Sequence, residues 1–210
     1  ACAPFRRLHL CDYNLETIDT DKIDIGKAKH DLLLEVCYAA KYEGDLIKTH
    51  YTPYQLTYPG SGSPICTALA RSFADIGDIV RGKDLFLGND EEKKQRKKLQ
   101  QNLKRIFAKI HKEVTNGELK ARYGSDAPYY YQLREDWWTA NRHTVWEAIT
   151  CKADTGNAYF RPTCNDTGIG PSVAQKQCRC DKHKGAKDDN QVPTYFDYVP
   201  QYLRWFEEWA

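Results

Sequence analysis

Basic side chains gather in one stretch of the chain, between Glu91 and Glu113, and their chemistry is that of anion binding. Nine basic residues stand there against three acidic ones. A helical face of this kind attracts polyanions, whether sulfated glycan or nucleic acid, because it concentrates positive potential and releases the counterions of the polyanion. The candidate residues for a glycan-binding site are Lys93, Lys94, Arg96, Lys97, Lys98, Lys104, Arg105, Lys109 and Lys112.

The same pattern is also typical of an ordinary solvated helix surface. Glu91 and Glu92 lie in the first turn of the expected helix and lysines lie toward its end, which is the arrangement that the helix dipole favours. Both interpretations stay open. The net charge of the whole chain is only +2, so it gives no general argument for a nucleic-acid partner, and we expect none.

Eight cysteines form the second set of residues with reactive side chains. So many in a chain of this size indicate disulfide bonds and an oxidising compartment. The alternative is a zinc site made of Cys164, Cys178, Cys180 and His183. Because only one residue separates Cys178 from Cys180, the usual C-x-x-C spacing of zinc ligands is absent. We therefore expect disulfides, with no metal and no cofactor.

Cys66 and Cys151 lie at the edges of two expected helices and are predicted to pair. A bond between them would tie distant segments, and closing such a long loop contributes about 4 kcal/mol in chain-entropy terms. The pairing of the other six stays open: Cys2, Cys11, Cys37, Cys164, Cys178 and Cys180.

No pattern of residues in the chain is typical of catalysis. The sequence contains no G-x-S-x-G motif, no phosphate-binding loop and no H-E-x-x-H motif among its six histidines. No cysteine has the neighbours of an activated nucleophile. The sequence therefore predicts a protein that is not an enzyme.

Two runs of aromatic residues, Tyr129-Tyr130-Tyr131 and Trp137-Trp138, are candidate binding anchors. Consecutive aromatic side chains cannot all face one core, so we expect at least one in each run to be exposed or at an interface. Aromatic anchors dominate binding hot spots. Packing against a further part of a longer parent protein is an equally good interpretation. Asn165-Asp-Thr167 is a formal N-glycosylation sequon and indicates an exposed loop.

Helices are expected to position these residues. Asp19 to Asp21 offers caps for a helix that reaches about Lys48. A second helix spans residues 65–80, with the apolar stripe Ile65, Leu69, Phe73, Ile76 and Val80.

Asn89 is expected to cap the long basic helix, and Asn116-Gly117 to stop it after about Thr115. Its stripe is Leu99, Leu103, Phe107, Ile110 and Val114. Residues 133–151 form the next expected helix, and a last one begins near Pro200. With no strand pattern and no run of about 18 apolar residues that could span a membrane, the fold class is mostly α, with long cross-linked helices and long loops.

Four blocks of the sequence resemble the α class of Duffy-binding-like domains, found in the variant erythrocyte membrane proteins of Plasmodium falciparum. The most specific is Ala70-Arg-Ser-Phe-Ala-Asp-Ile-Gly-Asp-Ile79. The blocks follow one another in family order and are Cys2–Cys11, Leu69–Ile79, Arg134–Cys151 and Val192–Trp209.

The resemblance implies a disulfide-stapled helical adhesion fold of three subdomains. By this comparison, residues 1–64 are the end of subdomain 1 and its connection. Residues 65–193 are subdomain 2, with a disulfide-rich loop at 152–193, and residues 194–210 begin a truncated subdomain 3. The resemblance also implies that Cys2 and Cys11 pair with residues upstream of this chain, and it agrees with a pairing of Cys66 and Cys151.

The function implied by the resemblance is cytoadhesion and rosetting by a variant, antigenically varying surface protein. The domain would lie on the extracellular face of the infected erythrocyte membrane, within a larger membrane-anchored parent. Implied partners are a host erythrocyte or endothelial receptor, a sulfated, heparan-sulfate-like glycan, neighbouring domains and host antibodies, with no membrane insertion by this segment. The alternative is a non-adhesive antigenic scaffold that packs against and positions a neighbouring receptor-binding domain.

Overall fold

The chain is mostly helical in a computed structural model that describes residues 2–57, 65–154, 159, 162–164, 172–174, 176–180 and 192–209. The elements are α1 (Phe5–Leu8), α2 (Tyr13–Glu16), η1 (Ile25–Lys27), α3 (Ala28–Thr57), α4 (Ile65–Arg81), α5 (Asp90–Glu113), α6 (Gly117–Tyr123), α7 (Tyr131–Ile149), η4 (Phe196–Tyr198) and α8 (Gln201–Trp209). In the described residues, β structure is limited to the isolated bridges Cys164–Ser172 and Lys176–Arg179. No helix within these ranges is both long and apolar enough to cross a bilayer.

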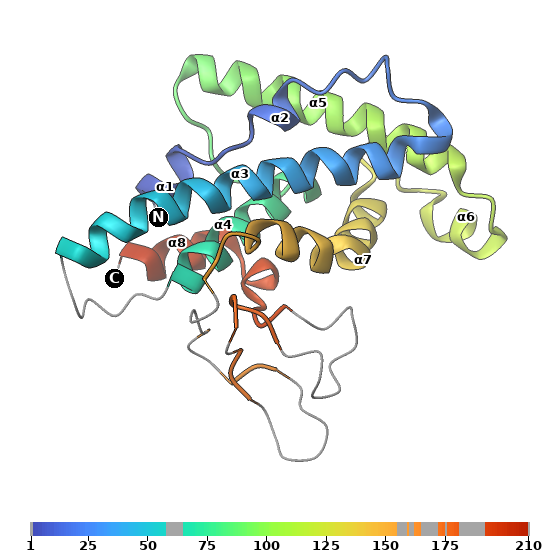
Figure 1. The fold of residues 1–210 in the computed structure, drawn as a ribbon. Coiled ribbons are helices and arrows are strands. Elements are labelled where there is room, and N and C mark those ends of the chain that lie inside the picture. Colours follow the sequence, from blue (N-terminus) through green and yellow to red (C-terminus); the bar gives the residue numbers. More distant parts are fainter. Residues whose placement is uncertain are drawn as a thin grey trace.

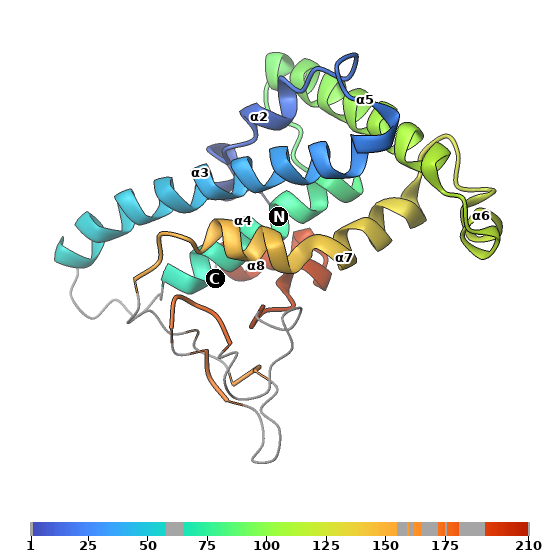
Figure 2. The same ribbon diagram turned by 45° about the vertical axis from the view of Figure 1, so that its right-hand side comes forward.

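The long helix α3 runs through the middle of the molecule and packs on both sides. It contacts α4 and α7 on one side and α2 and α5 on the other (Figures 1 and 2). The cysteine-containing segments that follow α7 lie at the opposite end of the molecule from α5. The two ends of the described chain meet, because the indole N–H of Trp209 donates to the carbonyl oxygen of Cys2 at 2.9 Å.

Helix α4 is the centre of the core, as its stripe predicted. Every α4 residue is buried except Ala68 and Arg71. Gly77 explains how the next layer approaches so closely, since a Cβ atom built at this position would lie 2.7 Å from the ring of Trp138. The glycine therefore lets a large aromatic side chain of α7 rest directly on the α4 backbone.

The expected bounds of α4, α7 and α8 are close to the observed ones, whereas α3 differs at both ends. Its α-helical part begins at Ala28, after η1, and continues to Thr57. Asp19 caps no helix; its carboxylate instead accepts a bond from the backbone N–H of Asp21 in a local turn. The local hydrogen bond competes with helix formation, as is common for Asp.

The Trp137-Trp138 run does not follow the expectation that at least one of the two is exposed or at an interface. Both indole rings are buried. Trp138 packs against Phe73 of α4, with ring centroids 5.1 Å apart, and Trp137 packs against Phe107 of α5 at 6.1 Å. Helix α7 contacts both α4 and α5, so two adjacent residues can each reach a different neighbour within one core.

The predicted disulfide between Cys66 and Cys151 is wrong. Cys66 bonds to Cys178, with Cα atoms 5.5 Å apart, and Cys164 bonds to Cys180. Cys151 is exposed beyond the end of α7, whereas Cys66 is fully buried. The thiols of Cys2, Cys11 and Cys37 are also free.

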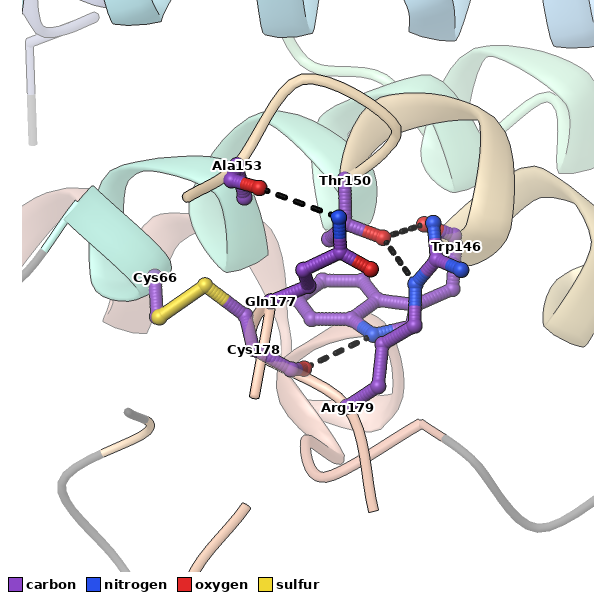
Figure 3. The surroundings of a disulfide bond; sticks show 7 residues. All are labelled: Cys66, Trp146, Thr150, Ala153, Gln177, Cys178 and Arg179. Atoms are coloured by element: carbon purple, nitrogen blue, oxygen red, sulfur yellow. Dashed lines mark hydrogen bonds between the residues drawn. A yellow bond between two sulfur atoms is a disulfide. The ribbon is translucent and has the colours of Figure 1, made fainter. Parts of the chain in front are cut away.

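The segment around Cys178 reaches Cys66 because it is fixed to the end of α7 (Figure 3). The indole of Trp146 donates to the carbonyl oxygen of Cys178 at 3.1 Å, and Arg179 Nε donates to Thr150 Oγ1 at 2.7 Å. Gln177 donates to the carbonyl oxygen of Ala153. These long-range bonds place Cys178 over the start of α4. The disulfides also take Cys164, Cys178 and Cys180 out of the alternative zinc site.

The polar residues of the 70–79 motif form a buried ionic network. Asp75, which is 0 % exposed, accepts from Arg6 at 2.7 Å and from Arg204 at 2.8 Å. Asp78 pairs with Arg204 at 2.5 Å and with Arg81 at 2.8 Å. We call this set the buried network. It ties α1, α4 and α8 together, so the carboxylates of the motif serve the fold.

Candidate anion-binding site

Helix α5 is held in a fixed orientation by its cap and its apolar stripe. Asn89 Oδ1 accepts from the backbone N–H groups of Glu91 and Glu92 at 3.0 Å, and Glu92 accepts in return from the N–H of Asn89. This is a complete capping box. The stripe from Leu99 to Ile110 is buried, so the opposite face must look outward.

The predicted end of α5 is only partly right. The helix ends at Glu113, and the next helix, α6, begins at Gly117, directly after Asn116. Asn116 caps a new helix, because its side chain accepts from the N–H groups of Glu118 and Leu119. An Asn that follows a helix can therefore start the next one.

Two of the nine basic residues are occupied within the fold. Arg96 forms ion pairs with Asp12 at 2.5 Å and with Asp84 at 2.7 Å. Lys109 donates to the carbonyl oxygens of Thr20 and Ile23 at 2.6 and 2.7 Å. These two side chains attach the N-terminal segment to α5, and they leave the proposed ligand face to the other seven.

The other seven basic residues form two rows along the helix. Residues four and seven apart lie on the same side of an α-helix. The pocket row consists of Lys93, Lys97 and Lys104, and the open row consists of Lys94, Lys98, Arg105 and Lys112. All of them are exposed except Lys104, which is half-buried.

A pocket of about 540 Å³ lies beside the pocket row. Its wall combines α5 with the segment that follows α4 and with the start of α7. Five cationic side chains and one carboxylate line it. The lining residues are Gly82, Asp84, Phe86, Leu87, Lys93, Arg96, Lys97, Gln100, Gln101, Lys104, Tyr129, Tyr131 and Arg134.

Arg134 lies in the wall of this pocket and is only 4 % exposed. Its Nε donates to the carbonyl oxygen of Val80 at 2.6 Å, and its Nη2 donates to Gln100 Oε1 at 2.9 Å. These partners are neutral, and burial lowers the pKa of Arg134 to about 10. The guanidinium stays charged at neutral pH without a carboxylate partner among the described residues.

Gly82 makes room for this guanidinium. Its φ is +76°, a conformation that favours glycine. A Cβ atom at this position would lie 2.8 Å from Arg134 Nη1. The free carbonyl groups at the end of α4 thus meet a cation, as helix C-termini favour.

Tyr129 and Tyr131 form the aromatic part of the pocket. Their rings stack 5.5 Å apart with an interplanar angle of 12°, and the residues are 55 % and 52 % exposed. Tyr130 between them has φ +59° and packs inward against His111. Lys104 Nζ lies 4.6 Å from the centroid of the Tyr129 ring, a cation–π contact. The prediction that at least one of these tyrosines is exposed is confirmed.

A family model described as the Duffy binding domain matches residues 1–204. The chain belongs to the Duffy binding domain family. This is a family of adhesion domains and not of enzymes. No curated protein sequence matches the chain significantly.

Several solved structures are similar to this Duffy binding domain. The NTS-DBL1α domain of Plasmodium falciparum membrane protein 1 (PfEMP1) from the varO strain is 43 % identical, with a TM-score of 0.72, over 100 % of this chain and 43 % of that one. The ICAM-1-binding PfEMP1 IT4var13 DBLβ domain is 34 % identical, with a TM-score of 0.67, over 97 % and 41 %. A DBLβ domain of PfEMP1 bound to human ICAM-1 is 31 % identical, with a TM-score of 0.65, over 97 % and 38 %. The chain thus spans less than half of these solved chains.

The basic run of this Duffy binding domain pointed to α5 as a candidate site, whereas no sequence pattern pointed to Arg134, Gly82 or Gln100. Arg134 is far from α5 in the sequence, and only the folding of α7 against α4 brings it there. The described residues contain no cluster of side chains that could hold a metal. His183 and the sequon at Asn165 lie outside the described residues.

Proposed function

We propose that this Duffy binding domain is an α-class domain of a PfEMP1-like parent and acts in cytoadhesion on the infected erythrocyte surface. Its ligand is a sulfated, heparan-sulfate-like glycan on host cells, and the outward face of α5 binds it. One observation carries this proposal. Lys97, Lys98, Arg105 and Lys112 extend into solvent from a fixed helix, and none has an ion-pair partner among the described residues.

A regular polyanion fits this surface for a physical reason. The two rows present positive charge at intervals of four and seven residues, which is about 6 and 10 Å along a helix axis. Each contact with a sulfate releases a bound counterion, so affinity falls as salt rises. The ion pairs of Lys93 with Asp90 and of Lys94 with Glu91 are exposed to solvent and contribute little to stability. A ligand can therefore replace them easily.

Retention on a heparin column tests the proposal. Replacement of Lys93, Lys94, Lys97 and Lys98 by Ser is expected to lower the salt concentration needed for elution. The matched control replaces the exposed Lys27, Lys29, Lys41 and Lys152 by Ser, which removes the same charge from other parts of the surface. Circular dichroism checks that both variants fold. An equal decrease in elution salt for both variants would show that only net charge matters and would overturn the α5 proposal.

The apolar surface of α8 favours a second candidate function, that of a scaffold which packs against and positions a neighbouring receptor-binding domain. Phe206 and Trp209 are 68 % and 62 % exposed, and Tyr202 and Leu203 beside them are exposed as well. A contiguous apolar surface of this kind marks an interaction site. Under the scaffold function, the four α5 substitutions would leave the attachment of the parent protein to host cells unchanged.

A further inference from the structure

We infer that the pocket beside α5 binds one acidic sugar unit of the glycan. Its carboxylate or sulfate lies against Arg134, Lys97 and Lys104, and its ring lies on the Tyr129–Tyr131 pair. The inference rests on the proposed function of α5 and names the part of the ligand that this pocket would recognise. The pocket would then be a site with a defined occupant within the more general electrostatic surface of α5.

Arg134 has unfilled hydrogen-bonding capacity. Its Nε and Nη2 donate to neutral acceptors, whereas its Nη1 has no hydrogen-bond partner among the described residues. A buried charge without an ion-pair partner is costly, and an anion in the pocket would compensate it. The planar guanidinium also matches a carboxylate or a sulfate, since it can offer two N–H groups to two oxygens.

Charge is divided unequally inside the pocket. Among the described residues, Asp84 is the only carboxylate of the lining, and its oxygens are taken by Arg7 at 2.5 Å and by Arg96 at 2.7 Å. Lys97 and Lys104 have no ion-pair partner in the described part of the chain. The pocket therefore keeps positive charge that the protein does not neutralise itself.

An aromatic surface lies beside these cations. The ring faces carry negative potential, so the weakly positive C–H groups of a sugar ring can pack on them. The left-handed backbone of Tyr130 turns one tyrosine into the core and leaves its two neighbours stacked in solvent. Strained residues of this kind cluster at ligand sites. An anion alone would need no such surface, whereas an acidic sugar uses both parts.

The volume of the pocket agrees with a single sugar unit. At about 540 Å³, the pocket lies within the range of roughly 300–1,000 Å³ that is usual for small-molecule sites. The pocket row of α5 lines the pocket, so the rest of the glycan can continue along the helix.

Titration calorimetry with a heparin-derived tetrasaccharide tests the inference. Lys97→Ser with Lys104→Ser is expected to weaken binding at least about tenfold, because two charged contacts are lost. The matched control is Lys98→Ser with Arg105→Ser on the open row, which removes the same charge and should weaken tetrasaccharide binding much less. Tyr129→Ala with Tyr131→Ala should weaken binding without any change of charge.

Two modified tetrasaccharides distinguish the anionic group. A desulfated form keeps only carboxylates, and a carboxyl-reduced form keeps only sulfates. Whichever form retains pocket-dependent binding identifies the group that Arg134 receives. Arg134→Lys keeps the charge but loses the planar pair of N–H groups, so it should weaken the binding of this same tetrasaccharide form. The lysine and tyrosine variants test the pocket even where Arg134→Lys impairs folding.

The result that overturns the inference is distinct from failure of the proposed function. Equal losses for the pocket and open-row variants, with no effect of the tyrosine substitutions, would leave α5 as a general heparin surface and remove the pocket from it. Absence of heparin retention by the wild-type protein would instead contradict the proposed function of α5 itself.

Discussion

The buried network and the α5 pocket both contain basic side chains, but these have opposite roles in the two regions. In the network, Arg6, Arg81 and Arg204 each face a carboxylate of α4, and every charge is paired inside the protein. In the pocket, Arg134 and Lys97 are without such partners among the described residues. Pairing, and not the number of basic residues, therefore separates charges that hold the fold from charges that remain available to a ligand.

The comparison also explains why the 70–79 motif identifies a family but not a ligand. Its Ser72 donates to Glu43 at 2.6 Å, and its two aspartates bind arginines from both ends of the chain. Its Gly77 accommodates Trp138. Ser72, Asp75 and Asp78 of the motif are thus each bonded to another part of the same molecule.

The largest expected effect comes from breaking the buried network. Asp75→Asn removes the charge that faces Arg6 and Arg204, and breaking a buried pair in this way costs about 3–5 kcal/mol of unfolding free energy. Urea unfolding followed by circular dichroism measures it. Asp90→Asn is the control, because its side chain is 91 % exposed. A loss below about 1 kcal/mol for Asp75→Asn would show that the network stabilises the fold no more than exposed ion pairs do.

A smaller effect is expected at Gly82, which links the core to the pocket. Gly82→Ala forces a side chain into a left-handed conformation, at a cost of about 1–2 kcal/mol. The new methyl group would also displace the guanidinium of Arg134, so tetrasaccharide binding should weaken. Gly117→Ala is the matched control, since a Cβ atom there has no neighbour within 4 Å. If Gly82→Ala kept full affinity for the tetrasaccharide, Arg134 would have no part in binding.

The pH dependence of stability should reveal a buried carboxylate beside the network. Burial raises the pKa of Glu43, despite its bonds from Ser72 and the N–H of Cys11 and the nearby charge of Arg6. A raised pKa means that the protonated form is favoured in the folded protein. Its contribution to stability is therefore fully present below the unfolded pKa and is lost as the pH rises through the folded pKa.

Glu43→Gln isolates this contribution, because the amide cannot titrate. The difference in unfolding free energy between wild type and variant should move in favour of the wild type as the pH falls from neutral toward the ordinary pKa of Glu, about 4.3. Urea unfolding at several pH values measures the difference. A difference that stays constant, or that moves toward the variant, contradicts the assignment.

The smallest effect on stability is expected on the open row. Lys98→Ser with Arg105→Ser should change the unfolding free energy by less than about 0.5 kcal/mol, because both side chains are exposed. Arg96→Gln on the same helix should cost about 1–3 kcal/mol, since it leaves the buried Asp84 with one cation fewer. Thermal or urea unfolding compares the two. Similar losses in both variants would contradict the separation of structural from available charges on α5.

Local patterns predicted the helices well, because periodicity and capping depend on neighbouring residues. The stripe of α4 and the Asn89 cap of α5 follow from residues within a few positions of one another. The failures at the basic residues of α5 depend on distant partners. Arg96 is engaged by Asp12 and Asp84, and Lys109 by carbonyl groups of the N-terminal segment, neither of which the basic run reveals.

The disulfide shows the same limit. Cys151 ends the Trp-rich block and was a natural partner for Cys66, but the hydrogen bonds of Trp146 and Arg179 bring Cys178 into that position instead. The pocket depended on a similar convergence. The tyrosine run was a visible signal of an exposed anchor, whereas the approach of Arg134 to Lys97 and Gln100 required the packing of α7 against α4 and α5.

The Cys66–Cys178 bond, which spans 112 positions of the chain, also closes a covalent ring. The ring contains α4, α5, α6 and α7. Cleavage of any single peptide bond between these two cysteines opens the ring but releases no fragment, so the basic helix stays attached to both ends of the chain. For a domain that we place outside the cell, where host proteases circulate, one nick in this region would not separate the proposed ligand surface from its parent.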